Sequence, residues 1–296
     1  MKFFSAALFL SALVAQPVLA KLTWSVKGTQ NGVPIPPAEI ILKPFESAYG
    51  HGGGGGGGGI FNGGGPEAPP AAASVGRAAR NRMVKRANPT ATSANWCGSV
   101  RTATSSNKIK LIHGYFQHPT CTKRAGVTTF PQAAASWIGI DGDSSTTLLQ
   151  MGTVCKIDNS TGIVRNEAWW QWVPDAAMTL ATMPVHAGDW FQITINTTSA
   201  TSAIISITNV NTLTAMTINL SAGTSLARID ADWIVERPAY GSGLAGFAQF
   251  TETWFQEAYA TLANGASLGV LGAKQYQITG GCSSAEYDNA DLSAWS

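Results

Sequence analysis

The chain has 296 residues, and its composition changes after Arg86. Residues 1–86 hold nine Lys/Arg against three Asp/Glu, whereas residues 87–296 hold ten against fourteen, with nine of the ten tryptophans and all four cysteines. The basic residues of the second part are few and scattered, which excludes nucleic acid as its partner. The remaining 210 residues suit one large all-β domain and are short for two lobes.

Residues 1–20 have the pattern of a secretory signal peptide. Lys2 precedes an apolar run at 3–15, and Val18-Leu19-Ala20 follows as a small-x-small cleavage pattern. The run is shorter than the roughly 20 residues that a membrane-spanning helix needs. We therefore expect a secreted, extracellular protein that has no membrane partner.

Residues 21–86 are predicted to be a pro-segment. Residues 52–59 are an unbroken glycine run, whose backbone entropy is too high and whose side chains are too few for a core. The basic stretch 77–86 ends in the dibasic pair Lys85-Arg86, a usual processing site, so the mature chain is expected to begin at Ala87. The alternative is a flexible linker with a basic tail.

Four cysteines in a secreted chain favour two disulfides over a metal site. Their spacing contains no C-x-x-C, and His113, His118 and His186 form no H-E-x-x-H, so neither a metal nor a cofactor is expected. Three pairings are possible. We favour Cys97 with Cys121 and Cys155 with Cys282, because the first pair closes a hairpin-sized loop.

Three Asn-x-Ser/Thr sequences follow Arg86, at Asn159, Asn196 and Asn219. Each is an acceptor pattern for N-glycosylation in a secreted protein. The side chains are therefore expected at the surface.

The second part alternates apolar and polar residues in short runs between Gly, Pro, Asn and Asp. The runs 190–195, 203–208 and 216–220 each have the period of a half-buried antiparallel strand. No long helical period competes with them. The pattern predicts an antiparallel two-sheet β-sandwich.

Three further runs, 147–151, 167–173 and 232–236, carry polar groups on one strand face, and in 167–173 Trp169 shares that face. Carboxylates, amides and indoles that meet on a concave sheet would form a cleft for an extended peptide or glycan. Tryptophan in a strand is more often core than site, so Trp170, Trp172 and Trp233 are assigned to the core.

Several catalytic mechanisms are excluded by missing residues. The elbow-like sequence Gly265-Ala-Ser267-Leu-Gly269 needs a later histidine, and the last histidine is His186. No Asp-Ser/Thr-Gly pair supplies an aspartic-protease dyad, and the glycine run lacks the Lys-Ser/Thr of a phosphate loop. With the cysteines oxidised, carboxylates and amides remain for catalysis.

Five motifs resemble those of the fungal glutamic peptidases, the eqolisins of the scytalidoglutamic and aspergilloglutamic type. They span most of residues 90–282 in the family's order and approximate spacing. The motifs are Asn95-Trp96-Cys97-Gly98, Trp137-Ile-Gly-Ile-Asp-Gly142, Leu148-Leu-Gln150-Met-Gly152, Glu167-Ala-Trp169-Trp-Gln-Trp172 and Asp232-Trp-Ile-Val-Glu236.

The resemblance implies a pepstatin-insensitive acid endopeptidase on a concanavalin A lectin/glucanase-like sandwich, acting on proteins and peptides. It implies a catalytic dyad of Gln150 and Glu236. Of the family's cleft positions, Trp137 and Trp169 match lining tryptophans, and Gly98 matches a backbone position close to the catalytic water. Polar candidates for substrate binding on the same or neighbouring strands are Asp141, Glu167 and Gln171.

The dyad is chemically sufficient for peptide hydrolysis. Glu236 can take a proton from water and return it to the leaving amine, while the Gln150 amide stabilises the tetrahedral intermediate. Because Gln150 cannot ionise, Glu236 would titrate as a single group, and activity would be confined to acid pH.

The competing interpretation is a carbohydrate-active enzyme or lectin on the same sandwich. A glycosidase would need a second carboxylate about 5 or 9 Å from Glu236. Asp232 is roughly 13 Å away along its strand, whereas Glu167 or Asp141 could approach from a neighbouring strand.

The charge asymmetry suggests a role for the pro-segment. Without residues 1–20 it carries eight Lys/Arg against three Asp/Glu, facing a domain of net charge −4. Our hypothesis is an intramolecular inhibitor of a monomeric enzyme, whose basic stretch covers the carboxylate-bearing cleft near neutral pH and loosens in acid.

Overall fold

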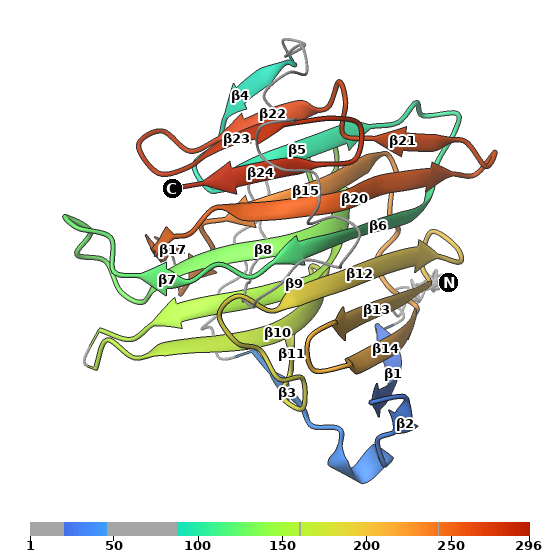
Figure 1. Cartoon of the computed structure of the whole chain (residues 1–296). Coiled ribbons are helices and arrows are strands. Elements are labelled where there is room, and N and C mark those ends of the chain that lie inside the picture. Colours follow the sequence, from blue (N-terminus) through green and yellow to red (C-terminus); the bar gives the residue numbers. More distant parts are fainter. Residues whose placement is uncertain (1–20, 46–87, 160, 242) are drawn as a thin grey trace, which may run out of the picture.

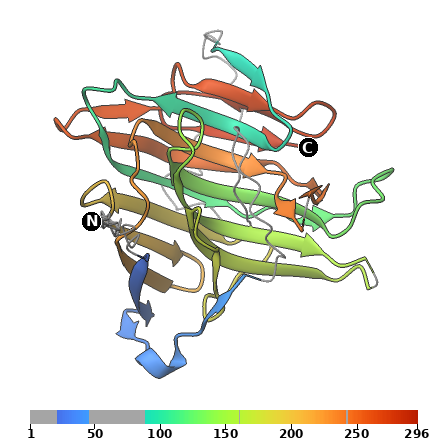
Figure 2. The same ribbon diagram turned by 180° about the vertical axis from the view of Figure 1, so that it is seen from behind.

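The computed structural model describes residues 21–45, 88–159, 161–241 and 243–296. Two ten-stranded sheets pack face to face in it (Figures 1 and 2). The helix found within the described residues is a single 3-10 turn, η1 (Pro37–Glu39), so the predicted all-β sandwich is confirmed. The predicted signal peptide, the glycine run, the basic stretch and Ala87 lie outside the described residues.

The first sheet has the strand order β2-β1-β14-β13-β12-β6-β20-β24-β23, and β21 also pairs with β20. All of its pairs are antiparallel. Its strands are β1 (Thr23–Gln30), β2 (Val33–Pro34), β6 (Ile109–Gln117), β12 (Trp190–Thr197), β13 (Ala203–Asn209), β14 (Thr214–Ser221), β20 (Thr253–Leu262), β21 (Ser267–Gly269), β23 (Ser283–Glu286) and β24 (Leu292–Trp295).

The second sheet has the order β3-β11-β10-β9-β8-β15-β5-β22-β4, and β18 also pairs with β8. The pairs β22 with β4 and β18 with β8 are parallel. Its strands are β3 (Leu42–Pro44), β4 (Thr90–Thr92), β5 (Trp96–Thr102), β8 (Gln132–Ile140), β9 (Leu148–Ile157), β10 (Val164–Val173), β11 (Met178–Leu180), β15 (Asp230–Glu236), β18 (Gly246–Phe247) and β22 (Lys274–Gln277). Two small ribbons pair β7 (Cys121–Thr122) with β19 (Gln249–Phe250) and β16 (Ala239–Tyr240) with β17 (Gly243–Leu244).

The main core lies between the two sheets. In β12 the alternate residues Phe191, Ile193 and Ile195 are fully buried there, as their period predicts. Trp170, Trp172 and Trp233 are also in this core, which confirms their assignment. Trp172 and Trp233 donate their indole N–H to backbone carbonyls, so their polar atoms are satisfied.

The beginning of the predicted pro-segment belongs to this fold. β1 pairs with β14 at the edge of the first sheet, and β3 pairs with β11 at the edge of the second. Residues 21–45 therefore extend both sheets, which the low-complexity pattern of the later pro-segment did not suggest (Figure 1).

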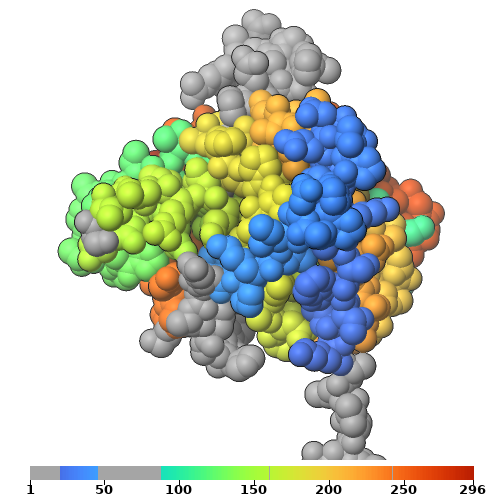
Figure 3. Space-filling model, turned by 90° about the horizontal axis from the view of Figure 1, so that it is seen from below, coloured from blue at the N-terminus to red at the C-terminus, as the bar shows by residue number. Residues whose placement is uncertain are grey.

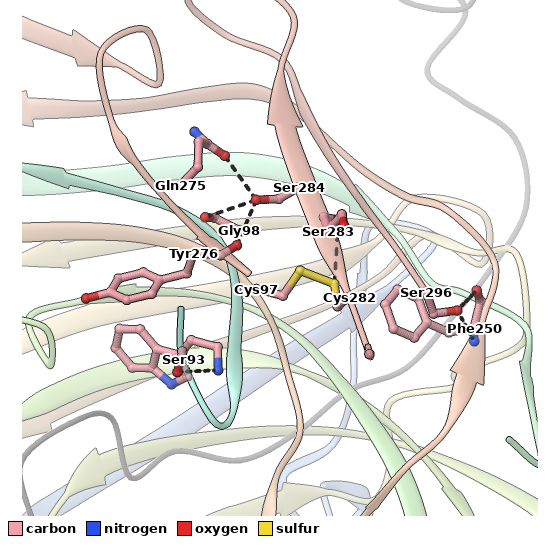
Figure 4. Close-up of a disulfide and its surroundings, with 12 residues drawn as sticks. Ser93, Cys97, Gly98, Phe250, Gln275, Tyr276, Cys282, Ser283, Ser284 and Ser296 are labelled. Carbon is pink, nitrogen blue, oxygen red and sulfur yellow. Dashed lines mark hydrogen bonds between the residues drawn. A yellow bond between two sulfur atoms is a disulfide. The ribbon is translucent and has the colours of Figure 1, made fainter. Parts of the chain in front are cut away.

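The favoured disulfide pairing is wrong. The structure pairs Cys97 with Cys282 (Figure 4) and Cys121 with Cys155. The chain around Cys282 returns beside β5, and β7 lies next to β9, so the bonds follow tertiary neighbours rather than short loops.

The three glycosylation acceptors differ in exposure. Asn159 and Asn219 are exposed, and Asn196 is half-buried on β12. Because their side chains are exposed, Asn159 and Asn219 are better candidates for the predicted modification than Asn196.

Within the described part of the chain, no helix has the length and apolar character required to cross a bilayer.

Candidate active site

The second sheet buries side chains on both faces. The face that points away from the first sheet, called the site face, carries its own apolar cluster. The members of this cluster are Phe45, Trp96, Val100, Ala135, Trp137, Leu148, Val154, Trp169, Ala177 and Ile234. Since residues two apart share a strand face, the predicted site residues Gln150, Glu167, Gln171 and Glu236 lie on the site face as well.

Strand register arranges these residues in cross-strand rows. One row contains Glu236, opposite Ala135 of β8. In the next row Ile234 lies opposite Trp137, and the row continues through Gly152 to Trp169.

A third row contains Gln150, the other residue of the expected dyad. Asp232 lies opposite Gly139, which lies opposite Gln150 and then Gln171. The expected dyad residues are thus on one face, two rows apart and separated by β8.

The Glu236 carboxylate is fully buried and is held by two N–H donors. Asn95 Nδ2 donates to its Oε1 at 2.9 Å, and Trp137 Nε1 donates to its Oε2 at 2.8 Å. Asn95 and Trp137 are both neutral donors, and their hydrogen bonds orient the carboxylate.

The Gln150 side chain is also fully buried. Its Nε2 donates to Gln171 Oε1 at 3.1 Å, and Gln171 Nε2 donates to the Asp175 carbonyl at 3.0 Å. Gln150 Oε1 has no hydrogen-bond partner among the described residues. A buried amide oxygen without a partner is costly and is typical of a site that receives a ligand or water.

Trp137 lies between the two residues of the expected dyad. Its Nε1 binds Glu236, while a Cβ added to Gly139, the residue opposite Gln150, would lie 2.9 Å from Trp137 Cζ3. The indole of Trp96 packs edge-on against Trp137 at 5.1 Å between ring centroids. This packing fixes the plane of the Trp137 ring and hence the direction of its N–H.

The backbone conformation and close packing at position 98 require glycine. Its φ is +142°, and an added Cβ would lie 2.2 Å from the Trp233 carbonyl oxygen. Ser284 Oγ donates to its carbonyl at 3.4 Å, next to the Cys97–Cys282 disulfide (Figure 4). The close approach of Gly98 to Trp233 belongs to the pairing of β5 with β15. The bonds from Ser284 and Cys282 join the start of β5, which carries Trp96, to the segment at β23.

The Asp141 carboxylate is occupied by backbone hydrogen bonds. Its buried carboxylate accepts backbone N–H bonds from Arg228 at 2.7 Å, Ile229 at 2.8 Å and Asp230 at 3.4 Å. Burial raises the pKa of Asp141, and these hydrogen bonds oppose the rise. Its oxygens support the start of β15, so we leave Asp141 out of the proposed substrate-binding residues.

Glu167 shares the row of Glu236 but is three strands away. At about 4.8 Å per strand the two Cα atoms are roughly 14 Å apart, and Asp232 is about as far along β15. Both separations exceed the usual carboxylate spacing of glycosidases. Glu167 instead faces Lys43 of β3, with Nζ 3.9 Å from Oε1.

Two residues at this site were missed by sequence reasoning. Asn95 belongs to a quoted motif, but its contact with Glu236 depends on the pairing of β5 with β15. Asp232 is fully buried and neither of its oxygens has a partner in the described structure. Its position four residues before Glu236 was the available signal, because strand period places both on one face.

The candidate site is closed in this structure. Glu236, Gln150, Trp137 and Trp169 are each 0% exposed. A cavity of about 410 Å³ opens at the edge of the site face, beside Lys156, Arg165 and Tyr240. In the part of the chain that the structure describes, no group of three His, Cys, Asp or Glu side chains is placed to hold a metal ion.

Replacing Asn95 with Ala is expected to lower kcat about 10- to 100-fold with little change in KM, because the Glu236 carboxylate loses one of its orienting donors. Steady-state assays on a protein substrate at acid pH measure this. Ser93→Ala, which removes the hydroxyl that binds the Asn95 amide oxygen at 3.1 Å, should have a smaller effect, and the exposed Ser106→Ala should have none. Full activity in Asn95→Ala would refute the positioning role.

Comparison with known proteins identifies the family. The profile of the Peptidase A4 family matches residues 94–293. Aspergillopepsin-2 of Aspergillus niger is 34% identical over 140 residues, which cover 46% of this chain and 48% of that protein. Scytalidopepsin B of Scytalidium lignicola is 28% identical over 149 residues, covering 48% and 51%. The chain spans about half the length of these curated relatives.

A solved structure agrees with the fold. Scytalido-glutamic peptidase, determined with a transition state analog inhibitor, superposes with a TM-score of 0.59 at 22% identity, over 68% of this chain and 98% of that one. At this identity the likeness concerns the fold. The family match, in contrast, covers 200 of the 296 residues and includes all five motifs, so the chain belongs to the Peptidase A4 family, the glutamic peptidases or eqolisins.

Proposed function

We propose that this protein is a secreted acid endopeptidase that hydrolyses peptide bonds in proteins through Glu236, Gln150 and an activated water. The observation that carries the proposal is the buried Glu236 carboxylate, held by two neutral donors on the same face as a Gln150 amide whose oxygen has no partner among the described residues. Membership in a peptidase family supports it.

The proposed mechanism gives each of these groups a defined role. Glu236 takes a proton from water as the water attacks the peptide carbonyl, and it returns the proton to the leaving amine. The Gln150 amide donates to the oxyanion of the tetrahedral intermediate. Trp137 and Asn95 hold the carboxylate in place, and Trp169 and Gln171 contribute to binding the peptide.

The finer parts of the proposal rest on the sequence and on relatives. We include secretion, glycosylation, insensitivity to pepstatin, synthesis as a zymogen and a monomeric mature enzyme. The peptide substrate is supported by a second structure of scytalido-glutamic peptidase, which holds a peptide based transition state analog.

The direct experiment incubates the processed protein with denatured haemoglobin at about pH 3, with and without pepstatin. We expect peptides to accumulate at the same rate in both, and the rate to fall as the pH approaches neutrality. A parallel incubation with β-glucans is expected to yield no product. Absence of proteolysis, or release of sugars instead, would overturn the proposal.

A further inference from the structure

Residues 21–45 connect the edges of both sheets. β1 pairs with β14 along its whole length, from Thr23 opposite Ser221 to Gln30 opposite Thr214. β3 pairs with β11, with Lys43 opposite Thr179. Figure 3 shows these residues, in blue, as a continuous band across this face of the molecule. One segment therefore supplies an edge strand to each sheet.

Backbone hydrogen bonds contribute to holding the band in place. Between the two strands, Ile41 N–H donates to Thr182 Oγ1 at 2.7 Å, and the same hydroxyl donates to the Glu39 carbonyl at 2.9 Å. Ala181 N–H donates to the Ile41 carbonyl at 2.9 Å. Most side chains of β1 are exposed, but Val26 packs against the main core and Trp24 lies edge-on to Trp170, with 6.3 Å between ring centroids. Strand pairing and this packing together attach this part of the segment.

The end of the band reaches the candidate active site. Phe45 is 5% exposed and packs in the same cluster as Trp137, Trp169 and Ile234. Its N–H donates to the Ala177 carbonyl at 3.0 Å, which continues the pairing of β3 with β11. Lys156 Nζ lies 5.2 Å from the centre of its ring. Phe45 thus takes part in closing the face that carries Gln150 and Glu236.

Charge contributes little to the described contacts of the band. An ion pair joins Lys43 Nζ to Glu167 Oε1 at 3.9 Å, and the lysine side chain is 45% exposed. Exposed ion pairs of this kind add little stability and are screened by salt. A buried aromatic side chain and paired edge strands respond weakly to salt.

We propose that the edges of β14 and β11 form a docking surface for residues 21–45, which stay bound by strand addition after the chain is cut beyond residue 45, with Phe45 as the anchor that closes the active site. The docking requires no peptidase activity, whereas its inhibitory effect rests on the function proposed above. On this proposal the domain recognises the pro-segment through residues 21–45, whereas the hypothesis based on charge placed this recognition in the basic stretch 77–86.

The test uses the full chain carrying Glu236→Gln, so that no self-cleavage occurs, cut with a protease specific for dibasic sites. Native mass spectrometry and size-exclusion chromatography then measure whether the N-terminal fragment remains with the domain. We expect one complex at low salt and also in about 1 M NaCl, where the Debye length is near 3 Å.

Two kinds of substitution distinguish the contribution of the Phe45 side chain from that of strand pairing. Phe45→Ala should weaken the complex about 100-fold, as loss of a buried aromatic ring implies. The pair Val26→Pro and Lys27→Pro should weaken it at least about tenfold, because at least one proline removes a ladder hydrogen bond between β1 and β14. Lys43→Gln, the matched charge control, should change it less than about threefold.

Each outcome bears on the proposal. A fragment that dissociates once cut, or that is released by salt and by Lys43→Gln but not by Phe45→Ala or the prolines, would overturn it. The same variants with Glu236 intact test inhibition, since Phe45→Ala should raise the initial activity of the cut protein. If no form hydrolyses protein, the proposed function fails while the binding result stands independently.

Discussion

Glu236→Gln is expected to lower kcat at acid pH by about 10³-fold or more, because the amide cannot take a proton from water or return it to the leaving amine. The substitution preserves the size of a side chain that is fully buried. It also keeps an oxygen that can accept the 2.8 Å bond from Trp137 Nε1. Circular dichroism and the melting temperature should therefore remain near the wild-type values while activity is lost.

Glu167→Gln provides the matched control for that experiment. It removes a carboxylate from the same cross-strand row, but one that faces Lys43 rather than the Trp137 indole. We expect less than a tenfold loss of kcat. Equal losses in both variants, or more than about a tenth of wild-type activity in Glu236→Gln, would contradict the assignment of Glu236 as the proton-transfer group.

Gln150→Ala tests the other half of the dyad. Loss of an oxyanion donor typically costs 10²- to 10³-fold in kcat. The fold should survive, because Gln171, which loses its hydrogen bond to Gln150, keeps the bond that its Nε2 donates to the Asp175 carbonyl.

Asp232→Asn is expected to make the protein more stable at neutral pH and to leave its stability in acid nearly unchanged. Asp232 is fully buried, and neither carboxylate oxygen has a hydrogen-bond partner among the described residues. Burial raises the pKa of Asp232 well above its usual value, and the carboxylates of Asp230, Asp141 and Asp143 raise it further, with Lys274 opposing them.

The direction of this change in stability with pH follows from proton linkage. Below the pKa of an unfolded Asp, about 3.9, the carboxyl is protonated in both states and burial carries no charge penalty. As the pH rises above that value, the unfolded chain releases the proton while the folded chain must keep it or bury a charge, so wild-type stability declines. A neutral amide removes this decline. Asp232 accordingly makes its largest contribution to stability in acid.

Melting temperatures measured from about pH 3 to 7 test this. We expect Asp232→Asn to exceed the wild type by more than about 5 °C near pH 7 and to match it within about 2 °C near pH 3. Glu257→Gln, which removes an exposed carboxylate on β20, should follow the wild-type curve. A parallel pair of curves for wild type and Asp232→Asn would rule out Asp232 as the source of the pH dependence.

Much of the site could be predicted from the sequence because strand period alone assigns a face. Period two placed Phe191, Ile193 and Ile195 in the core and separated Trp169 from its neighbours Trp170 and Trp172. The motif resemblance then indicated Gln150 and Glu236, and the structure brings both to the site face.

Tertiary structure decided which side chains meet. The contact of Asn95 with Glu236, the engagement of Asp141 by backbone N–H groups and the partners of all four cysteines depend on strand order, which local sequence does not specify. The role of residues 21–45 likewise appears only once the edges of β14 and β11 lie within reach of one segment. Sequence determined the alternation, the family and the candidate groups, because these depend on residue type and spacing along the chain. Register and sheet order determined the contacts, because they join residues up to 198 positions apart, as Thr23 and Ser221 are.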